Sequence, residues 1–78
     1  MKLYFAVWAK HLGLSQNAIS GRSASHGRFV SPPQISAIFA GKRDPTWPTL
    51  TAIAGAMGLS LGQLERLPKP GEKAAGTQ

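Results

Sequence analysis

The order of helix start and stop signals in the second half of the chain constrains its fold most strongly. From Val30 to Leu64 the sequence reads VSPPQISAIFAGKRDPTWPTLTAIAGAMGLSLGQL. Serine suits a helix start because its hydroxyl accepts a hydrogen bond from a free backbone N–H. Proline suits the first turn because the N–H groups there have no partner within the helix, and proline has no N–H. Glycine suits a helix end because it adopts the left-handed backbone conformation. The stretch therefore predicts three short helices joined by tight turns.

These signals place the three helices over residues 32–40, 48–57 and 61–66. Ser31 with Gln34, and Ser60 with Gln63, have the spacing of a capping box. Pro48 is expected as a first helical residue, and Pro68 ends the last helix. Apolar side chains at helical spacing are expected to face the core, namely Ile35, Ile38, Phe39, Leu50, Ile53, Ala54 and Met57. Leu61, Leu64 and Leu67 supply the apolar contacts of the last helix.

The first part of the chain predicts two further helices. Apolar residues from Phe5 to Leu12 give an amphipathic helix over residues 2–12, and Ser15 caps a second helix over residues 15–22. Residues 23–30 are expected to form a loop, since residues 20–28 contain glycines and serines but no large apolar side chain. Phe29 and Val30 resume the apolar pattern and are expected to anchor the chain to the core.

The length and composition fit one small domain. The chain has 78 residues, 42% of them hydrophobic, which suffices for a small core. It contains no cysteine, so packed helices rather than disulfides or cysteine-bound metal must hold the fold. Residues 1–67 are assigned to the domain, and residues 68–78 are expected to be a disordered tail because they have nothing large to bury.

The charge is strongly basic and unevenly distributed. The formal net charge is +6, and six lysines and arginines precede Asp44, the first of three acidic residues. Such a field favours a polyanion such as nucleic acid, although a solvated basic surface remains an alternative. The apolar run from Leu3 to Ala9 is much shorter than the ~20 residues that a membrane span needs. Without an export signal, we expect a cytoplasmic protein that does not bind membranes.

Several short motifs in this order resemble the lambda-repressor-like (Cro-type, Xre) helix-turn-helix DNA-binding domains. Gly13-Leu14-Ser15-Gln16 is similar to the entry of that family's second helix, and residues 30–38 resemble its recognition helix. The basic turn Gly41-Lys42-Arg43-Asp44-Pro45 and the apolar pattern from Leu50 to Ser60 also match. The resemblance covers residues 3–65 and implies an all-α, compact five-helix domain.

The chain departs from this family in one place. Between Gln16 and Val30 it is about five residues longer than the usual helix and tight turn, so either the second helix is extended or the turn has become a loop. If this segment carries Arg22 and Arg28 to the DNA backbone, it adds a phosphate clamp. The alternative is a tolerated excursion on the surface.

The resemblance also implies roles for individual residues in binding DNA. Gln16 would bond a phosphate and brace the recognition helix, and Lys42 and Arg43 would hold phosphates together with free backbone amides of their turn. Gln34 either contacts adenine through both atoms of its amide or completes the capping box, since one glutamine cannot easily do both. Six residues would lie nearest the major groove, with the prolines and the alanine making van der Waals contacts to thymine methyl groups: Ser31, Pro32, Pro33, Gln34, Ser36 and Ala37.

Other candidate sites receive structural interpretations. Trp8 and Trp47 are assigned to the core, and Asp44 is expected to cap or brace its turn. His11 and His26 are too isolated for a metal site, and no serine has a recognisable histidine base and carboxylate around it, so we expect neither cofactor, metal nor catalysis.

The sequence thus predicts a double-stranded DNA-binding transcription regulator, a dimeric repressor from a bacterium or bacteriophage, associated with the nucleoid. As a homodimer it would bind an inverted repeat, and leucines around the last helix (Leu61, Leu64 and Leu67) are the candidate dimer surface. Two alternatives remain open. One is an antitoxin-like protein that binds a partner protein and regulates its own promoter, and the other is an architectural DNA-binding protein of low specificity.

Overall fold

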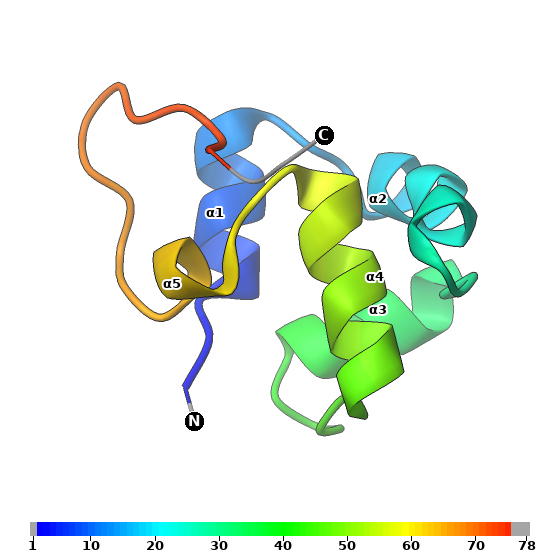
Figure 1. Cartoon of the computed structure of the whole chain (residues 1–78). Coiled ribbons are helices and arrows are strands. Elements are labelled where there is room, and N and C mark those ends of the chain that lie inside the picture. The colour runs from blue at the N-terminus through cyan, green and yellow to red at the C-terminus, as the bar shows by residue number, and fades with distance from the viewer. Residues whose placement is uncertain (1, 76–78) are drawn as a thin grey trace.

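The computed structural model describes residues 2–75, and this part of the chain is entirely helical (Figure 1). Its elements, in chain order, are α1 (Phe5–Leu12), α2 (Gln16–Ser23), the 3-10 helix η1 (Ala24–His26), α3 (Pro32–Phe39), α4 (Trp47–Met57) and α5 (Leu61–Leu64). In Figure 1, α1 and α5 lie on one side of α4, while α2 and η1 lie on the other. The prediction of an all-α fold with five α-helices is confirmed.

The core lies where α4 meets the other helices. Six large apolar side chains with at most 1% exposure form its centre: Trp8, Ile19, Val30, Ile35, Ile53 and Leu64. The predicted inner faces of α3 and α4 are confirmed, because Ile38, Leu50, Ala54 and Met57 are also buried. Phe39 is half-buried and its ring stacks on Phe5, with centroids 5.6 Å apart. Trp8 is buried as expected, and its indole Nε1 donates to the Arg66 carbonyl at 2.8 Å.

The helix ends use the expected chemistry. The Ser15 hydroxyl accepts from the Ala18 N–H at 3.0 Å, and Ser60 and Gln63 form a reciprocal capping box. Gly41 and Gly58 have φ values of 78° and 73°, the left-handed conformation predicted from their positions after α3 and α4.

Several helix boundaries differ from the sequence expectation, among them those of α2 and the end of α3, which shift by one residue. α1 begins at Phe5 rather than residue 2, because the Tyr4 N–H bonds to the Leu64 carbonyl at 2.8 Å and ties the preceding chain to α5. α4 begins at Trp47, so Pro48 is its second residue. α5 ends at Leu64 rather than residue 66, and Glu65 is its C-cap.

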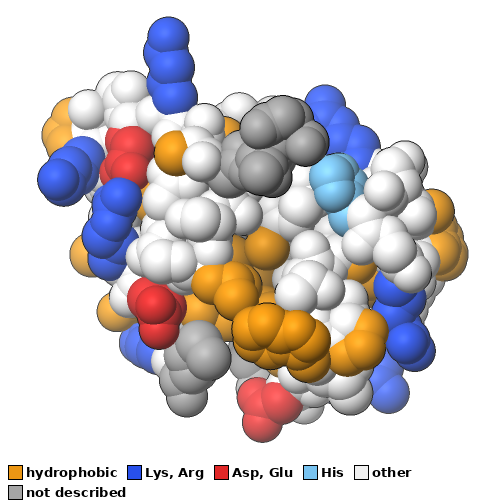
Figure 2. Space-filling model, in the orientation of Figure 1, with side chains coloured by type: hydrophobic (Ala, Val, Ile, Leu, Met, Phe, Trp, Pro, Cys, Tyr) orange, Lys and Arg blue, Asp and Glu red, His pale blue; other side chains and the backbone are white. Residues whose placement is uncertain are grey.

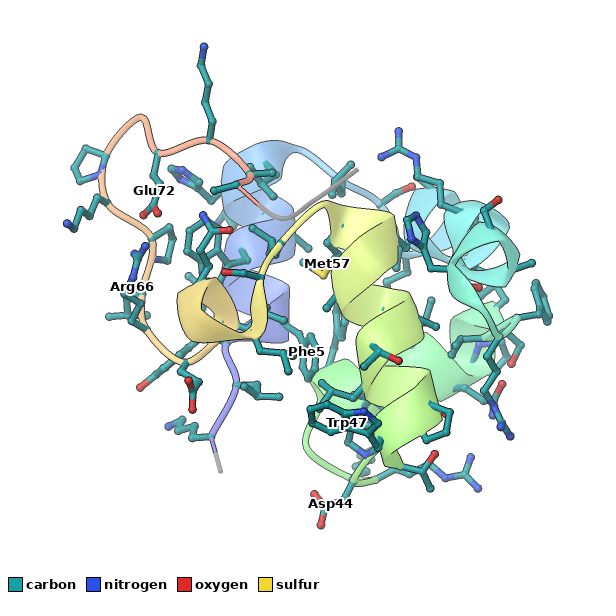
Figure 3. The ribbon with its side chains drawn as sticks, viewed as in Figure 1. Phe5, Asp44, Trp47, Met57, Arg66 and Glu72 are labelled. Carbon is teal, nitrogen blue, oxygen red and sulfur yellow. The ribbon has the colours of Figure 1, made fainter. Side chains whose placement is uncertain are left out.

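Two aromatic residues assigned to the core are on the surface instead. Trp47 is 61% exposed, because it is the first residue of α4 and lies outside the packed face that Leu50 and Ile53 provide. Phe29 is 59% exposed, whereas Val30 next to it is 1% exposed and alone anchors this segment. Figure 3 shows Trp47 at the start of α4.

The segment expected to be a loop over residues 23–30 is partly helical. α2 extends to Ser23, and η1 continues from it before Gly27, whose φ is 105°. The buried Ser23 hydroxyl donates to the Ser20 carbonyl at 2.7 Å and accepts from the Val30 N–H at 2.8 Å. The extra residues therefore extend the helix, and the buried hydrogen bonds of Ser23 hold them to the core.

The expected disordered tail is instead ordered over residues 69–75, which fold back beside α1 and α5 (Figure 1). Glu72 forms an ion pair with Arg66, and its backbone carbonyl lies 2.8 Å from His11 Nε2. The Gln63 side chain bonds to Glu72, Lys73 and Ala75. Residues 69–75 contain no large apolar side chain, and polar contacts hold them to the domain instead. Residues 76–78 of the predicted tail lie outside the described residues.

Candidate nucleic-acid interface

The amino end of α3 presents an apolar tip. Pro32 and Pro33 occupy its first two positions and have no N–H to donate. The Ser31 backbone N–H donates to Gln34 Oε1 at 3.0 Å, and the Ser31 hydroxyl donates to the same oxygen at 3.1 Å. The end of the helix therefore has few backbone donors for a phosphate, and contact with a ligand falls to side chains.

The outer face of α3 carries the remaining residues that were expected in the groove. Pro33 and Ser36 are exposed, whereas Ser31, Pro32, Gln34 and Ala37 are half-buried. The opposite face is buried through Ile35 and Ile38. The helix thus separates a core face from a small, mostly uncharged outer face, as its 3.6-residue period requires.

The turn after α3 is basic, but its first amides are already bonded. The Gly41 N–H bonds to the Ile38 carbonyl at 3.1 Å and the Lys42 N–H bonds to the Ala37 carbonyl at 2.9 Å. This is the Schellman pattern of helix termination. The expectation of free amides at these two residues is wrong, and the side chains of Lys42 and Arg43, both exposed, carry the positive charge of the turn.

A pocket of about 140 Å³ lies between the segment before α3 and the start of α4. Arg28, Gln34 and Arg43 line it from three different segments, and Asp44 lines it with them. The rest of its lining consists of Ile38, Pro45, Thr46 and Thr49. The lengthened segment thus brings Arg28 together with Gln34 and Arg43, whereas Arg22 is exposed on α2 and is not part of this lining.

Asp44 does not cap α4. Thr46 is the N-cap residue of that helix, and its hydroxyl donates to the Thr49 hydroxyl at 3.2 Å. Asp44 is exposed and is one of the residues that line the pocket. Figure 3 shows Asp44 in the turn before α4, with its side chain directed away from the ribbon. Its charge opposes that of the two arginines.

The charges separate into two regions. Within residues 2–75 the only ion pair closer than 4.0 Å joins Arg66 and Glu72, beside α5 and far from the α3 tip (Figure 3). The hydrogen bond from Arg66 is the main reason that the pKa of Glu72 lies well below its usual range, and the same bond raises the pKa of Arg66. The four cations around α2 and α3 have no such pair in the described chain: Arg22, Arg28, Lys42 and Arg43. Figure 2 shows Lys and Arg side chains along the edge of the molecule on the α2 side.

Gln16 lies where the sequence placed it, exposed in the first position of α2 after the cap Ser15. The three leucines of the candidate dimer surface do not share one environment. Leu64 is completely buried, so its assignment to an exposed surface is wrong, because α5 uses it to pack on the core. Leu61 is half-buried against the core, and Leu67 is 58% exposed.

Sequence reasoning did not identify Ser23, which fixes the approach to α3. Ser23 follows Ile19 by four residues, and both side chains are completely buried. A small polar residue at helical spacing from an apolar one is the signal that would have placed it on the inner face of α2.

No metal centre is evident in the described part of the chain, where no three His, Cys, Asp or Glu side chains are grouped to hold an ion. Within the same residues, no helix has both the length and the apolar character needed to cross a membrane. Neither observation adds a second candidate site to the surface around α3.

Comparison with known families decides the relationship of this chain. The helix-turn-helix family matches residues 10–64, from the last part of α1 to the end of α5. The chain belongs to the lambda-repressor-like (Xre) helix-turn-helix family. Domains of this family bind double-stranded DNA in transcription regulators and are not typically enzymes. Searches of curated proteins and of solved structures gave no match.

Proposed function

We propose that this helix-turn-helix domain is a dimeric, sequence-specific repressor that acts on nucleoid DNA in the cytoplasm of a bacterium or on a bacteriophage operator. The amino end of α3 carries the proposal. It presents Pro32 and Pro33 as an uncharged tip, and Arg28 and Arg43, which share a pocket with Gln34 of the same helix, would hold the DNA backbone. A tip of this shape fits into a major groove while the cations meet the phosphates that border it.

Sequence preference would arise mainly from apolar contact and DNA shape. Pro32, Pro33 and Ala37 have no side-chain group that hydrogen-bonds a base, so we assign them contacts with thymine methyl groups. Ser36 is exposed beside them and can both donate to and accept from a base edge. Gln16, Arg22 and Lys42 are assigned to phosphates, since all three are exposed, the first two on α2 and the third in the turn after α3.

Two-fold pairing of the domain would set the form of the operator. Two recognition helices in successive major grooves lie about 34 Å apart, which requires an inverted repeat with half-sites one helical turn apart. Leu67, exposed after α5, is the strongest remaining candidate for the pairing surface, together with the half-buried Leu61 at the start of α5.

Selection from a random duplex pool tests this proposal directly. The purified protein is incubated with the pool at physiological salt, the retained duplexes are sequenced, and the salt dependence of their binding is measured. Enrichment of an inverted repeat supports the dimeric regulator, because symmetry of the site mirrors symmetry of the protein. Retention without enrichment contradicts sequence specificity, and lack of retention contradicts the DNA-binding proposal and points to the antitoxin-like alternative.

A low-specificity architectural protein is the second candidate. The observation that favours it is the same apolar tip, because an interface without hydrogen bonds to bases discriminates weakly. It predicts nearly equal affinity for unrelated duplexes, whereas the repressor predicts a clear preference for the selected repeat.

A further inference from the structure

The hydrogen bond from the Ser31 backbone N–H fixes which atom of the Gln34 amide is the oxygen. A backbone N–H only donates, so the Gln34 atom 3.0 Å from the Ser31 nitrogen must be Oε1. The Ser31 hydroxyl donates to the same atom at 3.1 Å. With Oε1 engaged twice, Gln34 retains only the two N–H groups of Nε2 for a ligand.

These N–H groups are accessible to solvent. Nε2 of Gln34 has no hydrogen-bond partner among residues 2–75, and in the same part of the chain no buried side-chain nitrogen or oxygen lacks a partner. Nε2 is therefore not buried. Gln34 also lines the pocket together with Arg28 and Arg43, so three residues that carry side-chain donors border the same space.

We propose that this pocket binds one phosphate of the DNA backbone, with Arg28, Gln34 Nε2 and Arg43 as its donors. The inference rests on the proposed DNA-binding function and specifies how one site within it works. Gln34 then makes no bidentate contact with adenine, since that contact needs the oxygen already used at the helix cap. The amide oxygen of Gln34 accepts the hydrogen bonds of the helix cap, and the amide nitrogen donates to the phosphate.

The chemistry of the pocket suits an anion that only accepts hydrogen bonds. Guanidinium groups present forked donors that match phosphate oxygens. The volume of about 140 Å³ is several times the ~30 Å³ that one water occupies in the liquid, which leaves room for a tetrahedral anion. Arg28, Arg43 and Asp44 together carry a net charge of +1, so the site remains attractive to a phosphate despite the carboxylate.

The two arginines also flank α3 along the chain. Arg28 precedes the helix and Arg43 follows it, so a phosphate bound by both holds the two ends of the recognition helix to one point on the DNA backbone. This gives the lengthened segment before α3 a role in binding through Arg28, whereas Arg22 on α2 is not part of the pocket lining. A clamp of this kind sets the position of the α3 tip in the groove without reading a base.

Neutralising one phosphate at a time tests the proposal. Each phosphate of a selected duplex is replaced in turn by an uncharged methylphosphonate, and affinities are measured for wild type, Arg28→Ala, Gln34→Ala and the control Arg22→Ala. At one position the replacement should weaken wild-type binding about tenfold, the size of one charge-assisted contact. Arg28→Ala and Gln34→Ala should both lose this sensitivity, and Arg22→Ala should keep it. Loss at two different positions, or retained sensitivity in either pocket variant, would overturn the proposal.

Gln34→Glu separates the cap from the phosphate. Glutamate keeps a side-chain oxygen for the Ser31 N–H and suits the third position of a helix, so the urea midpoint should not fall. It removes the donor and adds a negative charge, so DNA affinity should fall much more in Gln34→Glu than in Ser25→Glu. Ser25→Glu adds the same charge at an exposed position outside the pocket. Equal affinity of these two variants would contradict the proposal.

Base preference gives the last criterion. Selection with Gln34→Ala should return the wild-type consensus, because a phosphate contact carries no sequence information. A changed preference at one base pair would instead show that Gln34 reads a base. If wild type retains no duplex, the DNA-binding function itself has failed, and that result is distinct from a failure of the pocket.

Discussion

The hydroxyl of Ser23 accepts a hydrogen bond from the Val30 N–H at 2.8 Å and connects the end of α2 to the residue before the cap of α3. The same hydroxyl donates to the Ser20 carbonyl at 2.7 Å, and its side chain is completely buried. One buried group thus fixes where the lengthened segment returns to the core. Because Arg28 lies in this segment, the bond also positions a residue of the proposed DNA interface.

Replacing Ser23 by alanine is expected to destabilise the domain. The substitution leaves the Val30 N–H buried without a partner, which costs about 1–3 kcal/mol. Urea unfolding of Ser23→Ala measures the loss, and Ser25→Ala is the matched control because that serine is exposed in η1. If both variants unfold at the same midpoint, the Ser23 bond does not stabilise the segment.

Gly55 is expected to tolerate no larger residue, although it lies inside a helix. A Cβ at this position would lie 2.5 Å from Nδ1 and 2.7 Å from Cγ of His26, so the His26 side chain, or η1 together with it, would have to move away from α4. This cost should exceed the gain of up to ~1 kcal/mol in helix propensity from glycine to alanine. Gly55→Ala should therefore unfold at lower urea concentration than wild type.

Two variants control this prediction. Gly21→Ala should be neutral or stabilising, because a Cβ there meets nothing within 4 Å. Adding His26→Ala to Gly55→Ala should restore most of the lost stability by removing the clash. If the double variant stays as unstable as Gly55→Ala, contact with His26 is not the cause.

Local patterns in the sequence sufficed to predict the helices. Caps and terminators depend on residues within one turn of each other. The positions of Ser15 and Ser60 followed from their hydroxyl groups, and that of Gly41 followed from the backbone freedom of glycine. The buried faces of α3 and α4 followed from apolar spacing. The family relationship was equally accessible, because it rests on the order and spacing of these local signals.

Contacts between distant segments could not be predicted in this way. Trp47 and Phe29 are apolar, but whether an apolar residue is buried depends on what the rest of the fold places against it. The ordered tail depends on polar contacts of Glu72 with Arg66 and Gln63, which no periodicity reveals. The pocket around Gln34 likewise combines residues from three segments, so only the helical extension through η1 shows how Arg28 reaches it.

The bond between Arg66 and Glu72 predicts a specific response to acid. Because the pKa of Glu72 is lowered in the folded protein, mainly by the hydrogen bond from Arg66, the stabilisation is present above the ordinary glutamate pKa of about 4.3 and declines as pH falls below it. The difference in free energy of unfolding between wild type and Glu72→Gln should be constant near neutral pH and shrink in acid. Arg66→Gln should behave alike, and a double variant that loses twice as much would contradict coupling of the two residues.

Leu67 is expected to affect dimer formation and DNA binding together. Leu67→Glu places a charge on the exposed candidate surface, so sedimentation equilibrium should show a shift to monomer and the affinity for an inverted repeat should fall in parallel. Val7→Glu on α1 is the control, since Val7 is 42% exposed and is not one of the leucines of the candidate surface. A monomeric wild type with full specific affinity would contradict the dimer.

Asp44 is expected to weaken DNA binding in the wild-type protein. Its carboxylate lines the pocket with Arg28 and Arg43 and does not cap α4, where Thr46 is the N-cap. Asp44→Asn removes one negative charge near the proposed phosphate, so duplex affinity should rise about twofold to tenfold at low salt, and the gain should shrink as salt screens the charge. Glu65→Gln makes the same charge change at the exposed end of α5 and should raise affinity less. Equal gains in the two variants would show that only the net charge matters, and a loss in Asp44→Asn would show that the carboxylate braces the turn.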